Sequence, residues 1–251
     1  IMLTGGAGFI GSHLCDEFVA TNNQVIVLTR NTTSLDRILH LKDRIILERA
    51  DVTDNDELGR IIEKHQPEVI IHLAGETSHS KSFENPLYDL DVNTKSTLYI
   101  LEKIKQLNLK CRFILGSTFI VIGRPQELPV TEQSVCNPTT IYGANRLASE
   151  VYCKIYHNVY GIDAITFRIT NSFGPREQFI PSKNAINFLI HKAFKKEPIP
   201  IFDKGNFFKD VVYVSDVVSA ISTIMEKGKP GDLYWISSGN KTWFYDLGTW
   251  L

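Results

Sequence analysis

Tyr142 and Arg146 are the residues of this chain best suited to move a proton. They stand four positions apart near the start of a segment with helical periodicity, so their side chains share one face of the predicted helix. A tyrosine hydroxyl is ordinarily too weak an acid to serve as a base at neutral pH, and a fixed cation beside it favours the phenolate. Thr118, at the end of a predicted strand, could donate a hydrogen bond to a substrate oxygen. Taken alone, the Tyr–Arg spacing is more typical of a surface pair, so this interpretation depends on the rest of the chain.

The first eleven residues join an apolar run, a glycine-rich turn and the start of a helical pattern. Gly5, Gly8 and Gly11 follow the spacing G-x-x-G-x-x-G. Backbone N–H groups at such a helix start point outward, and the helix dipole favours a phosphate there. A Cβ in the turn would block the approach of a pyrophosphate. Because Ser12 follows Gly11 where an ATP-binding loop has lysine, the turn favours a dinucleotide over ATP, and also over a turn without ligand.

Three further predicted strands end in residues that suit a dinucleotide. Arg30 follows the second strand, where a site for NAD usually has an acid, and a guanidinium suits the 2′-phosphate of NADP. NADP is therefore slightly favoured over NAD. Asp51 follows the third strand and can reach an adenine amino group, although a turn or capping role also explains it. The fourth strand ends in Ala74 and Gly75, which are small enough for the backbone to pass close to a cofactor.

Strands and helices that alternate along the chain would position these residues. Apolar runs predict strands at Ile1–Thr4, Gln24–Thr29, Ile45–Glu48, Val69–Leu73, Phe113–Gly116 and Ala164–Arg168. Helical periodicity predicts helices at Phe9–Ala20, Asp54–His65, Leu87–Leu107 and Tyr142–Tyr160. The strands are apolar on both faces, as parallel strands between two helix layers must be. The alternation predicts an α/β fold with a doubly wound parallel sheet.

The pattern becomes less regular after Arg168. Helices are expected at Ser182–Lys195 and Ser215–Lys227, with short extended segments at Ile199–Phe202, Val211–Val214 and Leu233–Ile236. We predict a dinucleotide-binding domain over residues 1–168 and a smaller substrate-binding lobe over residues 169–251, with one cleft between them. The turn-rich Asn171–Pro175 segment would connect the two parts.

Composition narrows the class of partner. The 251 residues are 43% hydrophobic and 22% charged, with a formal net charge of −1, which predicts no nucleic acid and no anionic membrane as partner. No apolar run approaches the ~20 residues that span a bilayer. The four cysteines form no CxxC pair and the seven histidines no HExxH motif, so we expect a reducing, cytoplasmic setting and no metal site. The chain starts inside a strand, so upstream residues are expected and a targeting segment stays open.

Taken in order, these motifs resemble those of an extended short-chain dehydrogenase/reductase. The nearest branch is similar to the NAD-dependent epimerase/dehydratase group that acts on nucleotide sugars. The motifs that carry the resemblance are Thr4–Gly11, Asp51-Val52, His72–Gly75, Asn93, Ser117-Thr118, Tyr142–Arg146, Arg168–Pro175 and Lys209–Val217. They run through essentially the whole chain, and several linked motifs are far more specific than one. The resemblance implies a Rossmann fold with a smaller C-terminal substrate lobe that is incomplete where this chain stops.

The resemblance also implies a role for each matching residue. The pyrophosphate would lie on Gly5, Gly8, Phe9, Ile10 and Gly11, the adenine on Asp51 and Val52, and the rest of the cofactor along Leu73, Ala74, Gly75 and Asn93. Tyr142 would be the general acid/base, Thr118 its hydroxyl partner, and residue 146 the cation on the nicotinamide ribose. Asn171 and Lys209 would face the sugar nucleotide, Lys209 near its diphosphate.

Three positions depart from the family pattern. The motif Tyr-x-x-x-Lys ends here in Arg146, which keeps the charge in a bulkier fork that does not lose its proton. Sugar 4,6-dehydratases carry Asp-Glu after the threonine, where this chain has Phe119 and Ile120, which transfer no protons. Lys209 stands where many members have arginine, so a point charge replaces a bidentate one.

These residues predict an enzyme that uses NADP or NAD on a nucleotide-activated sugar, as a 4-epimerase or a keto-sugar reductase. One alternative is a reductase of a non-nucleotide carbonyl compound. Another is a cofactor-binding protein with little turnover, such as a redox sensor or scaffold, which Arg146 keeps open. We also expect a homodimer, because the Leu87–Leu107 and Tyr142–Tyr160 helices are apolar on more than one face. The apolar positions are Leu98, Leu101, Ile104, Leu147, Val151 and Ile155.

Overall fold

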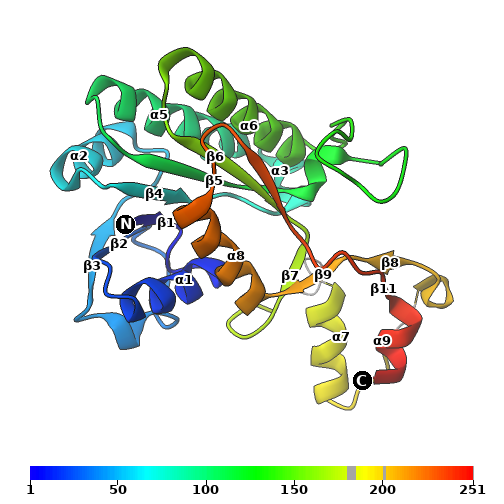
Figure 1. Cartoon of the computed structure of the whole chain (residues 1–251). Coiled ribbons are helices and arrows are strands. Elements are labelled where there is room, and N and C mark those ends of the chain that lie inside the picture. The colour runs from blue at the N-terminus through cyan, green and yellow to red at the C-terminus, as the bar shows by residue number, and fades with distance from the viewer. Residues whose placement is uncertain (180–184, 200–201, 251) are drawn as a thin grey trace.

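A sheet of seven parallel strands forms the centre of the molecule in the computed structural model (Figure 1). The structure describes residues 1–179, 185–199 and 202–250. From one edge to the other the strand order is β10-β6-β5-β4-β1-β2-β3. The bounds are β1 Met2–Thr4, β2 Val25–Thr29, β3 Ile45–Arg49, β4 Val69–His72, β5 Arg112–Thr118, β6 Ala164–Ile169 and β10 Leu233–Ile236. The order reverses direction on either side of β1, so the predicted doubly wound Rossmann fold is confirmed.

Helices cover both faces of this sheet (Figure 1). One face carries α1 (Phe9–Ala20) and α8 (Val214–Lys227), which pack on each other. The other face carries α2 (Asn55–His65), α5 (Ser96–Gln106) and α6 (Ile141–Tyr160), which follow one another across it. Two helix layers explain why the strands are apolar on both sides.

Each strand supplies alternate side chains to two separate cores. Met2 belongs to the core under α2, α5 and α6, whereas its neighbour Leu3 belongs to the core under α1 and α8, and both are fully buried. Ile26 and Val27 divide in the same way on β2. Because successive side chains of a strand point to opposite faces, an apolar run of this kind fits only a sheet covered on both sides.

The predicted elements of the first 168 residues are confirmed, with small shifts at their ends. The helix predicted over 87–107 is continuous and has three parts: α4 (Pro86–Leu90), a π-helical turn (Asp91–Lys95) and α5. The short helix α3 (His79–Glu84) was not predicted. Two 3₁₀ turns, Leu39–Leu41 and Phe119–Ile122, complete this part.

Two segments assigned to the smaller lobe belong instead to the large sheet and its helix layers. Strand β10 pairs in parallel with β6, with Leu233 opposite Thr166, and α8 packs on α1. The sequence did not indicate these contacts because they join segments distant along the chain. The division of the rest of the chain into two domains at residue 168 stays a prediction.

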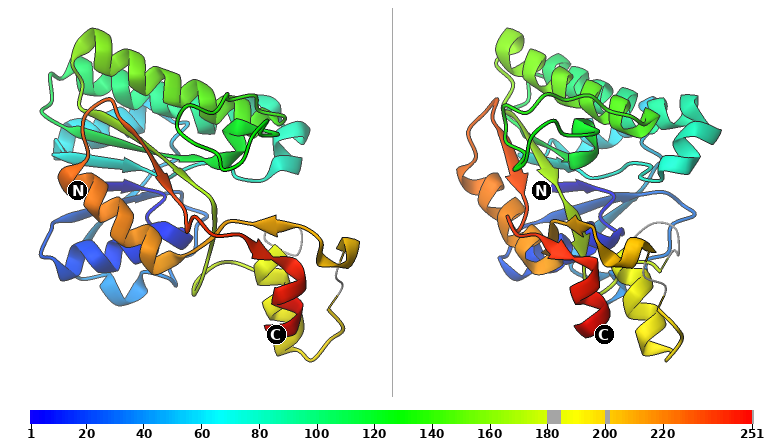
Figure 2. Two further views of the ribbon diagram at one scale, coloured as in Figure 1. Left: turned by 45° about the vertical axis from the view of Figure 1, so that its right-hand side comes forward. Right: turned by 90° about the vertical axis from the view of Figure 1, so that its right-hand side faces the viewer.

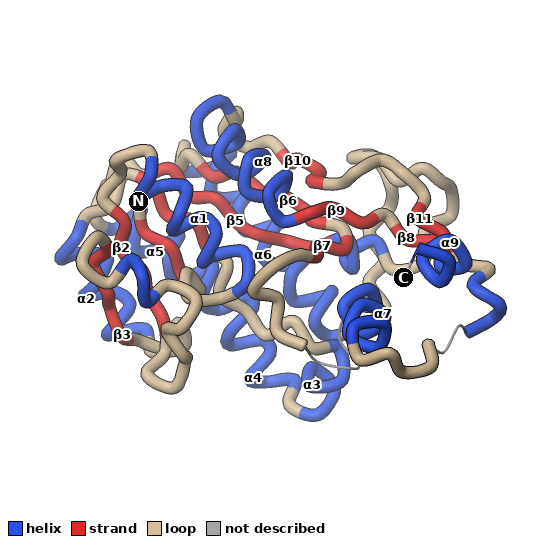
Figure 3. Tube along the Cα trace, turned by 90° about the horizontal axis from the view of Figure 1, so that it is seen from below, coloured by secondary structure: helices blue, strands red, loops and turns tan. Residues whose placement is uncertain are grey.

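The other C-terminal segments extend away from the sheet (Figures 2 and 3). Short strands β7 (Asn171–Phe173) and β9 (Val211–Tyr213) pair in parallel, and β8 (Phe208–Lys209) pairs with β11 (Thr242–Trp243) in the antiparallel sense. Helices α7 (Ala185–Phe194) and α9 (Phe244–Trp250) lie beyond them.

Two predicted elements of this region fall partly outside the described residues. They are the first three residues of the helix predicted at 182–195 and the middle of the segment predicted at 199–202. The segment that begins at Phe202 is a 3₁₀ turn, Phe202–Gly205. Within the described part of the chain, no helix has the length and apolar character needed to cross a bilayer.

Candidate active site at the carboxyl edge of the sheet

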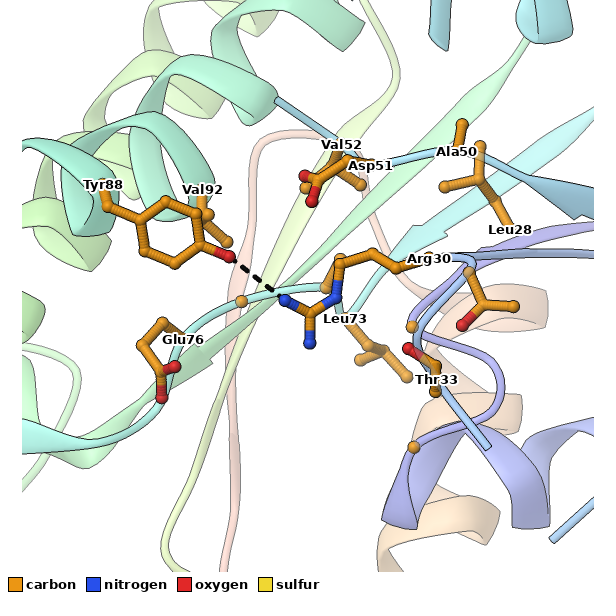
Figure 4. Close-up of a pocket in the computed structure, with 15 residues that line it drawn as sticks. Leu28, Arg30, Thr33, Ala50, Asp51, Val52, Leu73, Glu76, Tyr88 and Val92 are labelled. Atoms are coloured by element: carbon orange, nitrogen blue, oxygen red, sulfur yellow. Dashed lines mark hydrogen bonds between the residues drawn. The ribbon is translucent and has the colours of Figure 1, made fainter. Parts of the chain in front are cut away.

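A pocket opens where the carboxyl ends of β1, β2, β3 and β4 meet (Figure 4). It is lined by Gly5, Gly8, Leu28, Thr29, Arg30, Thr33, Ala50, Asp51, Val52, Leu73, Ala74, Gly75, Glu76, Tyr88 and Val92. Eight of these were predicted as cofactor-binding residues from the sequence: Gly5, Gly8, Arg30, Asp51, Val52, Leu73, Ala74 and Gly75. Ligands of open α/β sheets bind at this kind of edge, so the pocket is the candidate cofactor site.

The glycine-rich turn forms one end of the pocket. Gly5 has a φ of 71°, in the left-handed region, and its carbonyl oxygen accepts from the Gly8 N–H at 2.9 Å. A Cβ on Gly11 would lie 2.3 Å from the Gly5 oxygen, so only glycine lets α1 start this close to the turn. Gly8 caps α1 and provides no side-chain bond to its first N–H groups. The start of α1 therefore offers an open backbone cradle for an anion.

Arg30 spans the pocket to a partner that the sequence did not indicate. Its Nη1 donates to the Tyr88 hydroxyl at 3.1 Å, and Tyr88 comes from α4 on the opposite wall (Figure 4). Both side chains are exposed enough to exchange this bond for one with a ligand. Thr33 lies on the same wall as Arg30. No pattern in the sequence pairs residues 30 and 88, because the contact depends on how α4 packs over the sheet.

Asp51 lines the pocket while one of its oxygens is already engaged. Its Oδ1 accepts from the Thr53 backbone N–H at 3.0 Å and from the Thr53 hydroxyl at 2.9 Å. Asp54, not Asp51, caps α2 by accepting from the Glu57 N–H at 3.1 Å. The local turn thus orients the Asp51 carboxylate and leaves Oδ2 as its available acceptor.

Fully buried His72 connects β4 to β1 and to the first residue of α5. Its Nδ1 is 2.7 Å from the Thr4 hydroxyl, and its Nε2 is 3.0 Å from the Ser96 hydroxyl. The Thr4 oxygen accepts from the Ala74 N–H, and the Ser96 hydroxyl donates to the Val92 carbonyl. These partners assign the proton to Nε2. Burial, together with the nearby charge of Arg146, lowers the pKa of His72 to about 3, so it is neutral.

Arg146 is 2% exposed and lies against the backbone that leaves β4. Its Nη2 donates to the Ala74 carbonyl at 3.1 Å. Its Nε and Nη1 are buried without a hydrogen-bond partner among the described residues, as is the neighbouring Asn93 Oδ1. A buried guanidinium with two unpaired donors is costly unless a ligand supplies acceptors.

Tyr142 lies one turn before Arg146 and is buried at the start of α6. Thr140 caps this helix by accepting from the Gly143 N–H at 3.0 Å. The Tyr142 ring stacks on His79 of α3, with ring centroids 5.8 Å apart. His79 was not predicted as a site residue, and no sequence pattern would have indicated it.

Thr118 is held next to the first turn of α6. It ends β5, and its Oγ1 accepts from the Ile120 N–H at 3.3 Å, which leaves its own proton available. A Cβ built on Gly143, the neighbour of Tyr142, would lie 3.1 Å from the Ile120 carbonyl oxygen. The structure therefore brings the segment that follows Thr118 against the first turn of α6, which carries Tyr142.

Asn171 and Lys209 come from the segments that extend beyond the sheet. The Asn171 side-chain Nδ2 donates one hydrogen to the Asp210 carbonyl at 3.0 Å, which ties β7 to the segment before β9 and leaves the side-chain oxygen and the second N–H for a substrate. Lys209 is half-buried, and burial lowers its pKa. Its charge also helps to lower the pKa of His79, after the larger effect of burial. Lys209 therefore faces the side of the site that holds His79 and Tyr142.

A buried ion pair lies one turn further along α6. Arg168 Nη2 is 2.7 Å from Glu150 Oε2, and Arg168 Nε is 3.1 Å from Glu150 Oε1. The Ser117 hydroxyl donates to Glu150 Oε1 at 2.5 Å, and the Trp235 ring lies 5.3 Å from the Arg168 guanidinium. This pair fixes α6 to β5, β6 and β10, and hence fixes the helix that carries Tyr142 and Arg146.

The remaining predicted residues lie around the pocket rather than in its lining. Phe9, Ile10 and Gly11 open α1, and Asn93 is fully buried in the π-helical turn beside Arg146. The roles given to individual residues stay predictions. Among the described residues, no group of three His, Cys, Asp or Glu side chains could hold a metal ion.

Comparison with known proteins places the chain in a family. Residues 1–237 match the model of the NAD dependent epimerase/dehydratase family, so the chain belongs to it. The resemblance stated from the motifs is thereby confirmed, and the chain is classed as an enzyme of this family.

Individual relatives divide between two activities. The UDP-glucose 4-epimerase of Mycolicibacterium smegmatis is 30% identical over 251 residues, which cover 99% of this chain and 80% of that protein. The dTDP-glucose 4,6-dehydratase of Salmonella typhimurium is 30% identical over 264 residues, covering 96% and 72%. Among solved structures, the UDP-glucose 4-epimerase of Thermotoga maritima with UDP-glucose superimposes with a TM-score of 0.91 at 29% identity, covering 99% and 80%.

The residues at the site fit the cofactor that the family name implies. The glycine-rich turn leaves the backbone of α1 open to a pyrophosphate, and Arg146 has two buried donors without acceptors. A nicotinamide dinucleotide offers a diphosphate for the first and ribose oxygens as acceptors for the second.

Proposed function

We propose that this enzyme interconverts or reduces a nucleotide-activated sugar at C4, with Tyr142 as general acid/base. The observation that carries the proposal is that Tyr142 and Arg146 lie buried on successive turns of α6, and that Arg146 is bonded to Ala74 in the lining of the pocket that starts at the glycine-rich turn. A nicotinamide cofactor, when bound, accepts and returns a hydride. The chain's own residues bind, orient and move the proton.

Tyr142 takes the proton of the sugar C4 hydroxyl as the C4 hydrogen leaves as hydride, and returns it when the carbonyl is reduced. Arg146, whose Nε and Nη1 are buried without a partner among the described residues, would hold the nicotinamide ribose with these two donors. The Thr118 hydroxyl donates to the substrate oxygen. Tyr142 thus acts on a substrate that Thr118 helps to position, beside a cofactor that Arg146 would hold.

The segment after Thr118 favours epimerisation or reduction over dehydration. Phe119 and Ile120 begin a 3₁₀ turn where an acid and a base would be needed to remove water from the sugar. Aliphatic and phenyl side chains transfer no protons, so the 4,6-dehydratase activity of some relatives is not proposed here. Lys209, half-buried, and the Asn171 oxygen would contact the nucleotide diphosphate and the sugar.

Arg30 supports a preference for NADP over NAD. It lies at the end of β2 in the pocket, and its present partner is the neutral Tyr88 hydroxyl. A 2′-phosphate is a stronger partner for a guanidinium than a phenol is. The preference for NADP is therefore proposed to rest on this one side chain.

A homodimer is proposed through the outer face of α6. Val151, Ile155 and Val159 are exposed large apolar side chains on this face. Leu101 and Ile104, which the sequence also offered for the interface, are buried in the core of the monomer and do not contribute. Light scattering at micromolar concentration should give a dimer, and Ile155→Lys should give a monomer. A wild-type monomer would contradict the proposal.

Turnover with a panel of sugar nucleotides tests the proposed function. The wild-type protein, with NAD or NADP, should interconvert the C4 epimers of a UDP- or dTDP-hexose or reduce a 4-keto sugar. Tyr142→Phe should lower kcat about 10²–10⁴-fold while cofactor binding is nearly unchanged. Tyr160→Phe, at the exposed end of the same helix, is the matched control and should be active.

Three results would contradict the proposal. Activity that survives Tyr142→Phe would place the acid/base elsewhere. Cofactor binding without turnover of any sugar nucleotide would favour the cofactor-binding alternative. Formation of a 4-keto-6-deoxy sugar would favour dehydration.

A further inference from the structure

Gly75 occupies a position where Arg146 leaves no room for a side chain. A Cβ built on Gly75 would lie 1.9 Å from Arg146 Nη2 and 3.0 Å from Arg146 Cζ. The next contact is Asn93 Oδ1 at 2.7 Å. The guanidinium therefore lies directly against the backbone of residue 75, where it also donates to the carbonyl of Ala74 at 3.1 Å.

The backbone of Gly75 does not itself require glycine. Gly75 is absent from the positive-φ glycines of the chain, whereas Gly5, in the same pocket, has a φ of 71°. Alanine would thus be compatible with the backbone conformation at position 75, and only the space taken by neighbouring side chains excludes it.

The shape of the arginine explains why this space matters. A guanidinium is a planar fork with donors on three nitrogens, whereas a lysine ammonium is a compact charge on a flexible stem. The fork of Arg146 directs Nη2 toward the backbone at residues 74–75 and leaves Nε and Nη1 for another acceptor. If Nη2 were displaced by a Cβ, the orientation of the other two nitrogens would change with it.

We infer that Gly75 is a positioning residue for Arg146, and that the absence of a side chain at position 75 lets an arginine act as the ribose cation. The inference rests on the proposed function only for the identity of that ligand. Arg146 and Gly75 form a matched pair, so a side chain at position 75 is tolerated better when residue 146 is the slimmer lysine.

A four-protein set tests the pair: wild type, Gly75→Ala, Arg146→Lys and the double variant. The dissociation constants for NAD and NADP and the unfolding midpoint of the cofactor-free protein are measured for each. Gly75→Ala alone should weaken cofactor binding at least about tenfold and lower the midpoint. In the Arg146→Lys background, Gly75→Ala should cause less than a third of this loss of affinity and stability. The loss that remains would come from the contact of the new Cβ with Asn93.

Gly116→Ala is the matched control because it is crowded by residues other than Arg146. A Cβ there would meet Leu73 Cδ2 at 2.9 Å and Phe167 Cζ at 3.2 Å. Its cost should be the same with arginine or lysine at position 146. If Arg146→Lys also reduced the cost of Gly116→Ala, its effect would be a general gain in stability, and the inference would be overturned.

Equal costs of Gly75→Ala in both backgrounds would also overturn it. So would failure of both proteins that carry Gly75→Ala to fold, since Arg146 would then not be what excludes the side chain. The inference would be supported if the double variant folds and the single variant Gly75→Ala does not. Because the readouts are cofactor affinity and stability, rescue without turnover of any sugar nucleotide would refute the proposed function and leave the pair intact.

Discussion

Two buried arginines contact successive turns of α6, and their surroundings differ: Arg146 belongs to α6 itself, whereas Arg168 of β6 pairs with Glu150, one turn further along the helix. Arg146 is 2% exposed and Arg168 is 4% exposed. Arg168 faces the Glu150 carboxylate with contacts of 2.7 to 3.2 Å, so its charge is compensated within the protein. Arg146 has one carbonyl acceptor and two unpaired nitrogens. Burial is the same, but only one of the two charges is neutralised by the fold.

We infer from this difference that the charge of Arg168 stabilises the fold, whereas the charge of Arg146 serves to bind a ligand. An uncompensated buried cation costs free energy of folding, and a fold retains it only if something outside the chain supplies the missing acceptors. The cofactor pocket is where Arg146 would find them. Arg168, beyond it, keeps α6 in register with β5 and β6.

The largest expected effect is on stability, at the compensated pair. Arg168→Ala should lower the free energy of unfolding by about 3–5 kcal/mol, because Glu150 would remain buried without its partner. Denaturant unfolding measures this. The control is Arg112→Ala. Arg112 pairs with Asp163 at 2.9 Å nearer the surface, so its substitution should lower the free energy of unfolding by only about 1 kcal/mol. Equal losses at the two positions would contradict the contrast.

His72 should make stability depend on pH below neutrality. The pKa of His72 is about 3 in the folded protein, against an ordinary 6.5. Between these two pH values the unfolded chain binds a proton that the folded chain does not. Stability is therefore fully present above about pH 6.5 and should fall by about 2 kcal/mol by about pH 5. Unfolding of wild type and His72→Gln at both pH values isolates this part of the slope. Parallel slopes would show that His72 is protonated in the fold.

Arg30 extends the comparison to an arginine at the open side of the pocket, bonded to the neutral Tyr88 hydroxyl at 3.1 Å. Because it is exposed, its removal should change stability little. Arg30→Ala should reduce the preference for NADP over NAD about tenfold, the value of one charge-assisted bond. Titration of both cofactors measures the ratio. Wild-type preference for NAD that is unaffected by the substitution would exclude the proposed role, and Tyr88→Phe should leave the ratio almost unchanged.

The sequence predicted those parts of the fold that local pattern determines. Helix α1 has the predicted bounds, because its glycine turn and apolar spacing are local features. The pairing of β10 with β6 and the π-helical turn at Asp91–Lys95 were not predicted, since both depend on packing between distant segments.

The candidate site divides in the same way. The cradle around Gly5 and the Tyr142–Arg146 spacing are visible in the sequence because each lies within one motif. The contacts of Arg30 with Tyr88, of His79 with Tyr142 and of Arg146 with Gly75 join different elements. Composition and periodicity carry no information about such contacts, so the sequence could not show that two nitrogens of Arg146 have no partner among the described residues.

Thermal unfolding of wild type and Arg146→Ala, each with and without NAD or NADP, tests the central claim most directly. The account predicts that Arg146→Ala leaves the midpoint of the cofactor-free protein unchanged or raises it, because an uncompensated buried charge is removed. It also predicts that most of the cofactor-dependent rise in midpoint is lost, as affinity falls at least about tenfold. A large fall in the cofactor-free midpoint, like that expected for Arg168→Ala, with an undiminished cofactor-dependent rise would contradict it.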